Sequence, residues 1–347
     1  MNMNGKIRLI AAVFLIFPIV GGCARPGIPI TYLVPPASKE AMHFRKVAIT
    51  PMKYGDQYGR QDESGNFREQ VEAALASVKV NGEQYFTVSE REHTDQVLRE
   101  IQWTQASGLF SNQQALKLGK FLGVQGIYTG TVYAPVVNRS HFWQTHSDYR
   151  DCHDGKCHRR EYDVRCVKLE ASFSFTPKLI DVERNQVVYS NNLGASATDE
   201  ACEDSQRPLK SPGELLAEAQ GAVLQQFIKD VAPTYETQRV ALMDADGSVT
   251  SAIVQQKLAQ GMQFAQGGRM DRACEYWREA YAMAQWSVAL NYNLGVCAES
   301  AGNLPEALGF YQKADKLLTA PNSDVTEALA RISAAMNDQQ TFRRHAN

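Results

Sequence analysis

Apolar residues follow two kinds of pattern along this chain, and the change comes near residue 235. Before that point, three short stretches rich in β-branched and aromatic residues predict strands: Phe44–Met52, Gln84–Val88 and Gly123–Tyr133. Two longer strands, Leu169–Val182 and Gln186–Ala195, are predicted with a tight turn at 183–186 between them. Residues 138–163 are polar, and we expect them to form a loop.

Helices are predicted between these strands. Apolar residues spaced three or four positions apart form one stripe and indicate a helix over about 67–78: Phe67, Val71, Leu75 and Val78. Capping boxes start two further helices at Ser89 and Ser111, and Ser211-Pro212-Gly213-Glu214 starts a fourth. The order β-α-β-α-α-β-β-β-α predicts an α/β fold, one mixed sheet with helices, over residues 44–235.

Residues 251–340 are rich in alanine and show no strand pattern, so we expect an all-α domain there. Gly261 and Trp277 recur 34 residues later as Gly295 and Tyr311. This period resembles the tetratricopeptide repeat, with copies at 251–285 and 286–320 and a capping helix over Asp324–Met336. Two ordinary helical hairpins are the alternative. Residues 236–250 are expected to be an interdomain linker.

The N-terminus has a secretory pattern. Lys6 and Arg8 precede the apolar run Leu9–Val20, which is too short to span a bilayer, and Gly21-Gly22-Cys23 follows. Val20-Gly21-Gly22-Cys23 resembles the bacterial lipoprotein box. The resemblance implies removal of residues 1–22, acylation of Cys23 and, because Ala24 follows, sorting to the outer membrane. An ordinary signal peptide is the alternative. The proline-rich residues 23–43 are expected to form an extended tether.

Composition narrows the classes of partner. The chain carries 36 basic and 38 acidic residues, a formal net charge of −2, and the basic residues form no concentrated patch. We therefore expect no nucleic-acid partner. With 44% hydrophobic and 21% charged residues, the chain can build ordinary cores.

Seven cysteines include Cys23, and six remain for pairing outside the cytoplasm. A turn near Arg184 pairs residues whose numbers sum to about 368, which predicts a bond between Cys166 and Cys202 across the hairpin. Cys152 and Cys157 would then close a small loop, although four cysteines allow three connectivities. The other two cysteines either form a bridge or remain free thiols: Cys274 and Cys297.

Histidines gather around the first cysteine pair. Imidazole and thiolate groups suit zinc or copper, but the spacing matches no closed zinc pattern: His141, His146, Cys152, His153, Cys157 and His158. Asp244-Ala-Asp246-Gly247 is only a fragment of a calcium loop. No catalytic triad or carboxylate pair has sequence support, so we expect a non-enzymatic protein without metal or cofactor.

Several short motifs resemble the domain shared by curli-secretion channel lipoproteins (CsgG) and penicillin-binding-protein activator lipoproteins (LpoB). They are Val47-Ala-Ile-Thr-Pro51, Tyr85–Arg91, Leu118–Val124, Thr129–Val132 and Leu179–Val182. The resemblance implies a CsgG/LpoB-like domain over 44–235 and envelope partners such as a peptidoglycan synthase or a secretion component.

Two functions follow from that resemblance. The first is a periplasm-facing outer-membrane scaffold or regulator of cell-envelope assembly. The alternative is a subunit of an oligomeric curli-type secretion channel. A channel needs membrane-crossing strands near 138–163 and 196–212, and the charged residues that crowd both stretches count against it.

Overall fold

The structure is a computed structural model that describes residues 27–55, 61–100, 112–153 and 156–345. It divides into two compact units. The α/β unit comprises Thr31–Glu236 with Ala334–Asn347, and the helical unit comprises Met1–Ile30 with Thr237–Ser333. No helix among the described residues has the length and apolar character that a membrane crossing requires.

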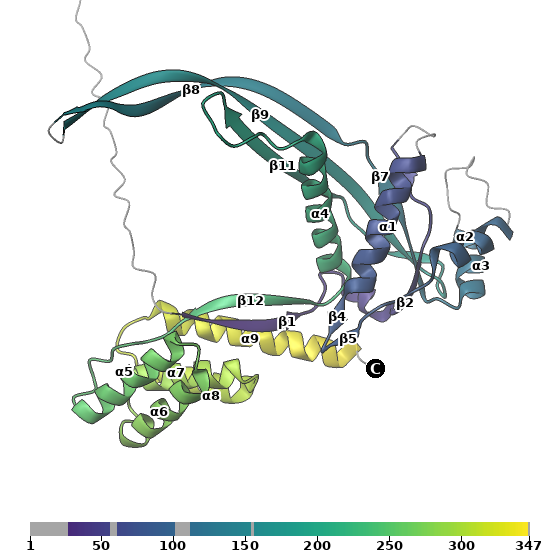
Figure 1. The fold of residues 1–347 in the computed structure, drawn as a ribbon. Coiled ribbons are helices and arrows are strands. Elements are labelled where there is room, and N and C mark those ends of the chain that lie inside the picture. The colour runs from purple at the N-terminus through teal and green to yellow at the C-terminus, as the bar shows by residue number, and fades with distance from the viewer. Residues whose placement is uncertain (1–26, 56–60, 101–111, 154–155, 346–347) are drawn as a thin grey trace, which may run out of the picture. The chain divides into compact units, whose positions relative to one another are not determined.

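The α/β unit is built on an eight-stranded mixed sheet with the path β10-β9-β7-β2-β6 (Figure 1). Strand β2 runs parallel to β6 and β7, whereas β9 runs antiparallel to all its neighbours. The strands are β2 (Lys46–Ile49), β3 (Lys53–Tyr54), β6 (Thr87–Val88), β7 (Gly126–Val132), β8 (Val136–His153), β9 (Lys156–Asp181), β10 (Gln186–Ser190) and β11 (Leu193–Cys202).

Strand β9 organises this sheet because it is 26 residues long. On one edge it pairs first with β8 and then with β7, and on the other edge it pairs with β11 and then β10. Four shorter strands are thus joined through one continuous strand.

Helices cover both faces of the sheet around β7, because successive side chains of a strand point to opposite faces. Tyr128 belongs to a core with α1 (Gln61–Ser77) and α4 (Pro212–Val231). Its neighbour Ile127 belongs to a second core with α2 (Arg91–Glu100) and α3 (Asn112–Leu122). The helix predicted over about 67–78 is α1, which starts earlier at Gln61 and ends at Ser77, and the side chains of the predicted stripe are all buried, with Val78 just past the helix end. The mixed α/β class is confirmed.

The turn after β9 forms where the sequence predicts it. The Asp181 carboxylate accepts the backbone N–H groups of Glu183 and Arg184 at 2.8 and 3.0 Å. A bulge between Val187 and Tyr189 shifts the register, and from Leu193–Phe175 to Cys202–Cys166 the paired numbers sum to 368. The predicted register is therefore confirmed beyond the bulge.

The predicted loop over residues 138–163 is wrong. The described residues of this stretch, 138–153 and 156–163, belong to β8 and the first part of β9, which pair from Val136–Ser172 to Arg150–His158 with a last pair at His153–Lys156. The pattern misled because both faces of this hairpin carry polar residues, so no apolar alternation marks the strands.

The predicted tether over 23–43 is also wrong within its described part. Strand β1 (Gly27–Val34) pairs with β12 (Thr234–Ala241), and a 3-10 helix covers Lys39–His43. Ile28 and Ile30 are buried and alternate with exposed Pro29, which is a strand pattern. A further short hairpin joins β4 (Lys79–Val80) and β5 (Glu83–Gln84).

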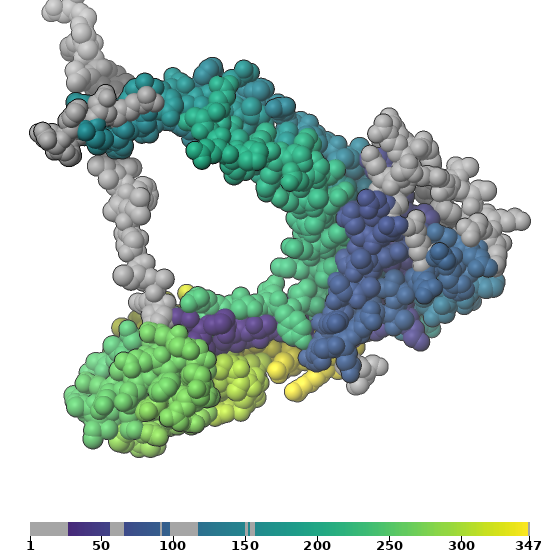
Figure 2. All heavy atoms as spheres, viewed as in Figure 1, coloured from purple at the N-terminus to yellow at the C-terminus, as the bar shows by residue number. Residues whose placement is uncertain are grey.

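The helical unit contains two successive helical hairpins, seen as a compact group in Figure 2. They are α5 (Ala252–Gln266) with α6 (Met270–Met283), and α7 (Val288–Ser300) with α8 (Leu304–Leu317). A methyl group added at Gly261 would lie 2.2 Å from the Trp277 indole, and one at Gly295 would lie 2.5 Å from the Tyr311 ring. The close approach repeats at the 34-residue spacing. The last helix, α9 (Ser323–His345), extends beyond the predicted Met336.

Candidate functional site

The α/β unit carries an exposed two-stranded arm, which we define as residues 136–153 of β8 and 156–165 of β9. Within the described chain, this part of β9 pairs with β8 alone, because β11 reaches only to Cys166. The arm extends past α4 in Figures 1 and 2. Its backbone is fixed by strand pairing, so its side chains are presented on a defined surface.

One face of the arm carries large exposed aromatic residues. Trp143 and Tyr149 are 70% and 68% exposed, and their odd numbers place both on the same face of β8. Arg165 lies opposite Trp143, and Arg159 lies opposite Tyr149. Tryptophan, tyrosine and arginine are the residues most enriched at energetically important positions of protein interfaces. This face has the composition of a protein-binding surface.

Disulfides close both ends of the arm. Cys152–Cys157 joins the strands at the tip, and Cys166–Cys202 joins β9 to β11 at the base. A third bond, Cys274–Cys297, links α6 to α7 in the helical unit. The two pairs predicted for the arm are bonded in the structure, and of the two alternatives left open for Cys274 and Cys297 the structure shows the bridge. Three disulfides are characteristic of a chain that folds in an oxidising compartment.

The base of the arm also holds a polar cluster around His146. Its Nδ1 lies 2.7 Å from the Asp204 carboxylate, which also accepts the Tyr162 hydroxyl at 3.1 Å. Hydrogen bonding to His146 holds the pKa of Asp204 below its usual range. The imidazole lies near the sulfurs of Cys166 and Cys202, but those sulfurs are bonded to each other and are not thiolate ligands. The cluster therefore fastens the 203–209 segment to the arm.

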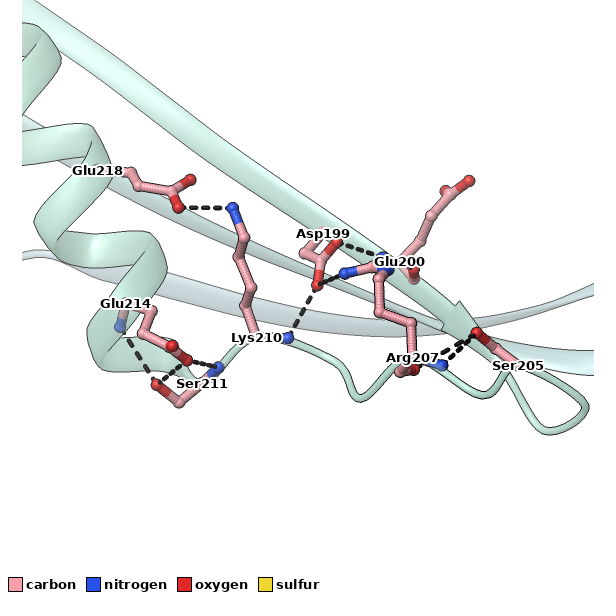
Figure 3. A network of polar contacts seen from close by, with 8 residues as sticks. All are labelled: Asp199, Glu200, Ser205, Arg207, Lys210, Ser211, Glu214 and Glu218. Carbon is pink, nitrogen blue, oxygen red and sulfur yellow. Dashed lines mark hydrogen bonds and ion pairs between the residues drawn. The ribbon is translucent and has the colours of Figure 1, made fainter.

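A second polar network fixes the start of α4 (Figure 3). Arg207 donates to both Asp199 carboxylate oxygens at 2.7 and 3.0 Å, and the Lys210 backbone N–H donates to the same carboxylate at 2.8 Å. The hydrogen bonds from Arg207 and Lys210 hold the pKa of Asp199 well below its usual range. Ser211 and Glu214 form the predicted capping box. The network folds the chain after β11 back along the strand.

In the helical unit, a buried ion pair fixes α7 against its neighbours. The Glu299 side chain is fully buried and accepts two bonds from Arg331 at 2.9 Å each. The Tyr311 hydroxyl also donates to Glu299, and burial raises the pKa of Tyr311 far above its usual range. Removing one partner would leave a buried charge unpaired. This cluster has a structural role.

Some candidate residues lie outside these sites. Cys23 lies outside the described residues. Among the six expected metal candidates, the two cysteines are bonded to each other at the arm tip, and His146 pairs with Asp204 at the base. Sequence reasoning missed Trp143 and Tyr149, because two aromatic residues among polar neighbours do not make the apolar alternation that marks a strand. It also missed the Asp199–Arg207 pair, which only the folded chain brings together.

No family model matches the sequence, and no curated protein matches it either. Twenty-five chains of solved structures match. The LpoB C-terminal domain from Salmonella enterica is similar at 9% identity and a TM-score of 0.27, over 46% of this chain and 95% of that chain. Lipoprotein GNA1162 from Neisseria meningitidis is similar at 14% identity and a TM-score of 0.28, over 52% and 96%.

A third similar structure is the PelC dodecamer from Paraburkholderia phytofirmans, at 14% identity and a TM-score of 0.26, over 60% of this chain and 99% of that chain. TM-scores of this size are too low to support an inference about function. The structural neighbours thus include LpoB domains and a lipoprotein, all at low identity.

Proposed function

We propose that this chain is a lipid-anchored outer-membrane protein that faces the periplasm and serves, without catalysis, as a scaffold or regulator of cell-envelope assembly. The observation that carries the proposal is Val20-Gly21-Gly22-Cys23 after a charged start and a short apolar run. The three disulfides support export to an oxidising compartment.

Two features support work through protein contacts. The arm presents Trp143 and Tyr149 to solvent on one face. The helical unit repeats its glycine–aromatic contacts at the period of tetratricopeptide repeats, which commonly form binding surfaces. The partners would be envelope proteins, such as a peptidoglycan synthase or a secretion component.

The anchor is tested by comparing wild type with Cys23→Ala, both exported to the periplasm. We expect wild type in the membrane fraction with acyl chains on Cys23 by mass spectrometry, and the variant in the soluble fraction. An unmodified Cys23 in soluble wild-type protein would refute the anchor.

The partner class is tested by a photo-crosslinking amino acid placed at Trp143. The matched control is Val187, an apolar residue of β10 that is 49% exposed. We expect crosslinks to envelope proteins from position 143 and few from 187. Equal, sparse labelling at both positions would count against the arm as the binding surface.

One observation favours the alternative function, an oligomeric secretion channel. Residues 138–163 form paired strands, in the place where the channel family has a hairpin. Exposed charges nevertheless occupy the arm, including Arg159, Arg160 and Glu161. Light scattering of the Cys23→Ala variant separates the two functions. A soluble monomer or small oligomer supports the regulator, and a large ring that requires detergent supports the channel.

A further inference from the structure

Helix α7 is buried around its whole circumference, which is unusual for a helix in a small helical unit. Every residue from Ala289 to Glu299 is buried. A helix at the edge of a domain normally leaves one polar face exposed to water. Part of α7 is covered by α6 and α8, and residues 241–249 cover a further part. We call residues 241–249 the inner segment.

The first contacts of the inner segment go through its backbone. The Asn293 carboxamide oxygen accepts the Met243 N–H at 3.0 Å, and its nitrogen donates to the Met243 carbonyl at 2.8 Å. Two residues earlier, the Ala241 carbonyl accepts the Tyr292 hydroxyl at 3.1 Å. One side chain thus satisfies both polar groups of Met243, as a neighbouring strand would. Recognition of this kind depends on an extended backbone and not on the identity of the side chains.

Three side chains of the inner segment supply the remaining specificity. Leu242 and Val249 are buried. Asp246 accepts hydrogen bonds at the start of α7, from the Ser287 hydroxyl at 2.6 Å and from the Ala289 N–H at 3.1 Å. A carboxylate is stabilised at the N-terminus of a helix. Burial acts to raise the pKa of Asp246, but the hydrogen bonds from Ser248, Ser287 and Ala289 outweigh it and the pKa is lowered.

The contacts between the inner segment and α7 are ones that another peptide could make. Residues 242–251 belong to no helix or strand, and the segment does not lie within the chain loop that the Cys274–Cys297 disulfide closes. Every hydrogen bond described above between the segment and α7 could be made by another peptide with the same backbone shape and one acidic residue. The segment therefore has the properties of a ligand that is covalently attached to its own binding site.

We infer that the face of α7 bearing Tyr292 and Asn293 is a peptide-binding groove, which the inner segment occupies and which an extended segment of a partner protein takes over. The fitting segment has an apolar residue followed four positions later by an acidic residue, the spacing of Leu242 and Asp246. This inference rests on the proposed function only in that an envelope protein supplies the displacing segment.

The test uses the full chain and a fluorescent peptide with the sequence of residues 239–250. In the variant Met243→Pro/Asp246→Ala, the inner segment loses the N–H that Asn293 accepts and the acid that bonds α7. We expect the peptide to bind this variant at least about 10-fold more tightly than wild type, because the tethered segment competes at high effective concentration. Adding Asn293→Ala should abolish the binding. Asp244→Ala, which changes an exposed acid of the same segment, should behave as wild type.

Failure of the peptide to bind a folded double variant would overturn the inference. Hydrogen exchange of wild type provides a second test that needs no variant. The Met243 amide should exchange through local release, faster than the amides of α7. Exchange at the same slow rate as α7 would show that the segment is a fixed part of the core and would also overturn the inference. Both tests use purified protein, so failure of the proposed envelope function would leave their results unchanged.

Discussion

The two ends of β9 belong to the same strand but have opposite environments. The C-terminal part has β7 along one edge and β11 followed by β10 along the other, and Phe175 is almost completely buried there in a core shared with α1 and α4. The N-terminal part pairs only with β8, and its residues are mostly exposed, with Val164 as a buried exception. The backbone is paired in both parts, with one register shift in each, between Val187 and Tyr189 and between Arg150 and His153. The difference teaches that pairing sets where the strand runs, whereas coverage by helices decides which residues stabilise the fold and which remain available for contacts.

The largest expected effect is on stability at the buried end. Phe175 lies 5.0 Å from the Phe67 ring and 6.0 Å from the Phe227 ring, centroid to centroid. Phe175→Ala should lower the free energy of unfolding by about 3–5 kcal/mol, because it leaves a cavity among those rings. Trp143→Ala on the arm should change it by less than about 0.5 kcal/mol. Urea titration of both variants measures the contrast, and similar losses would mean that the arm is not free of the core.

The disulfide at the base of the arm should stabilise the fold more than the disulfide at its tip. Cys166–Cys202 closes a sequence separation of 36 residues and Cys152–Cys157 one of 5. The loop-entropy relation gives about 4 kcal/mol for the base bond and about 2 kcal/mol for the tip bond. Replacing each pair by alanines and measuring thermal unfolding should therefore show the larger loss at the base. A larger loss at the tip would contradict the view that the base bond closes the sheet.

Two glycines beside β9 test how tightly its edges are packed. A methyl group at Gly130 of β7 would lie 2.5 Å from the Thr176 carbonyl oxygen, whereas one at Gly194 of β11 would lie no closer than 3.4 Å to any heavy atom. Gly130→Ala should cost about 1–3 kcal/mol through overpacking. Gly194→Ala should change stability by less than about 1 kcal/mol. Equal urea midpoints for the two variants would show that the β7 edge relaxes without cost.

The smallest effect concerns pH. The pKa of Asp199 is lower in the folded chain than in the unfolded chain, where it is about 3.9. The unfolded state therefore binds a proton first as the pH falls, and the stabilisation by Arg207 is present above pH about 4 and lost below it. Wild type should lose more stability between pH 5 and pH 3 than Asp199→Asn does. Identical slopes of the urea midpoint against pH would remove Asp199 from the acid sensitivity.

The C-terminal half of β9 could be predicted from the sequence, whereas its N-terminal half, which pairs with β8, could not. From Leu193 to Cys202 the pairing with β9 follows from a turn position and a period of two, and the predicted Cys166–Cys202 pair follows from that register. β8 escaped prediction because a ribbon with water on both faces has no apolar alternation. The inner segment escaped because Asn293 and Asp246 are polar residues that only packing brings onto an extended chain.

The start of β1 at Gly27 sets how far the chain can rise from a membrane. Three residues lie between Cys23 and Gly27, which makes four steps along the chain, and a fully extended chain spans at most about 3.6 Å per step. A lipid on Cys23 would therefore keep Gly27 within about 14 Å of the anchored residue. The same lipid would thus hold the first strand of the fold, and not only a free chain end, close to the surface of the membrane that carries it.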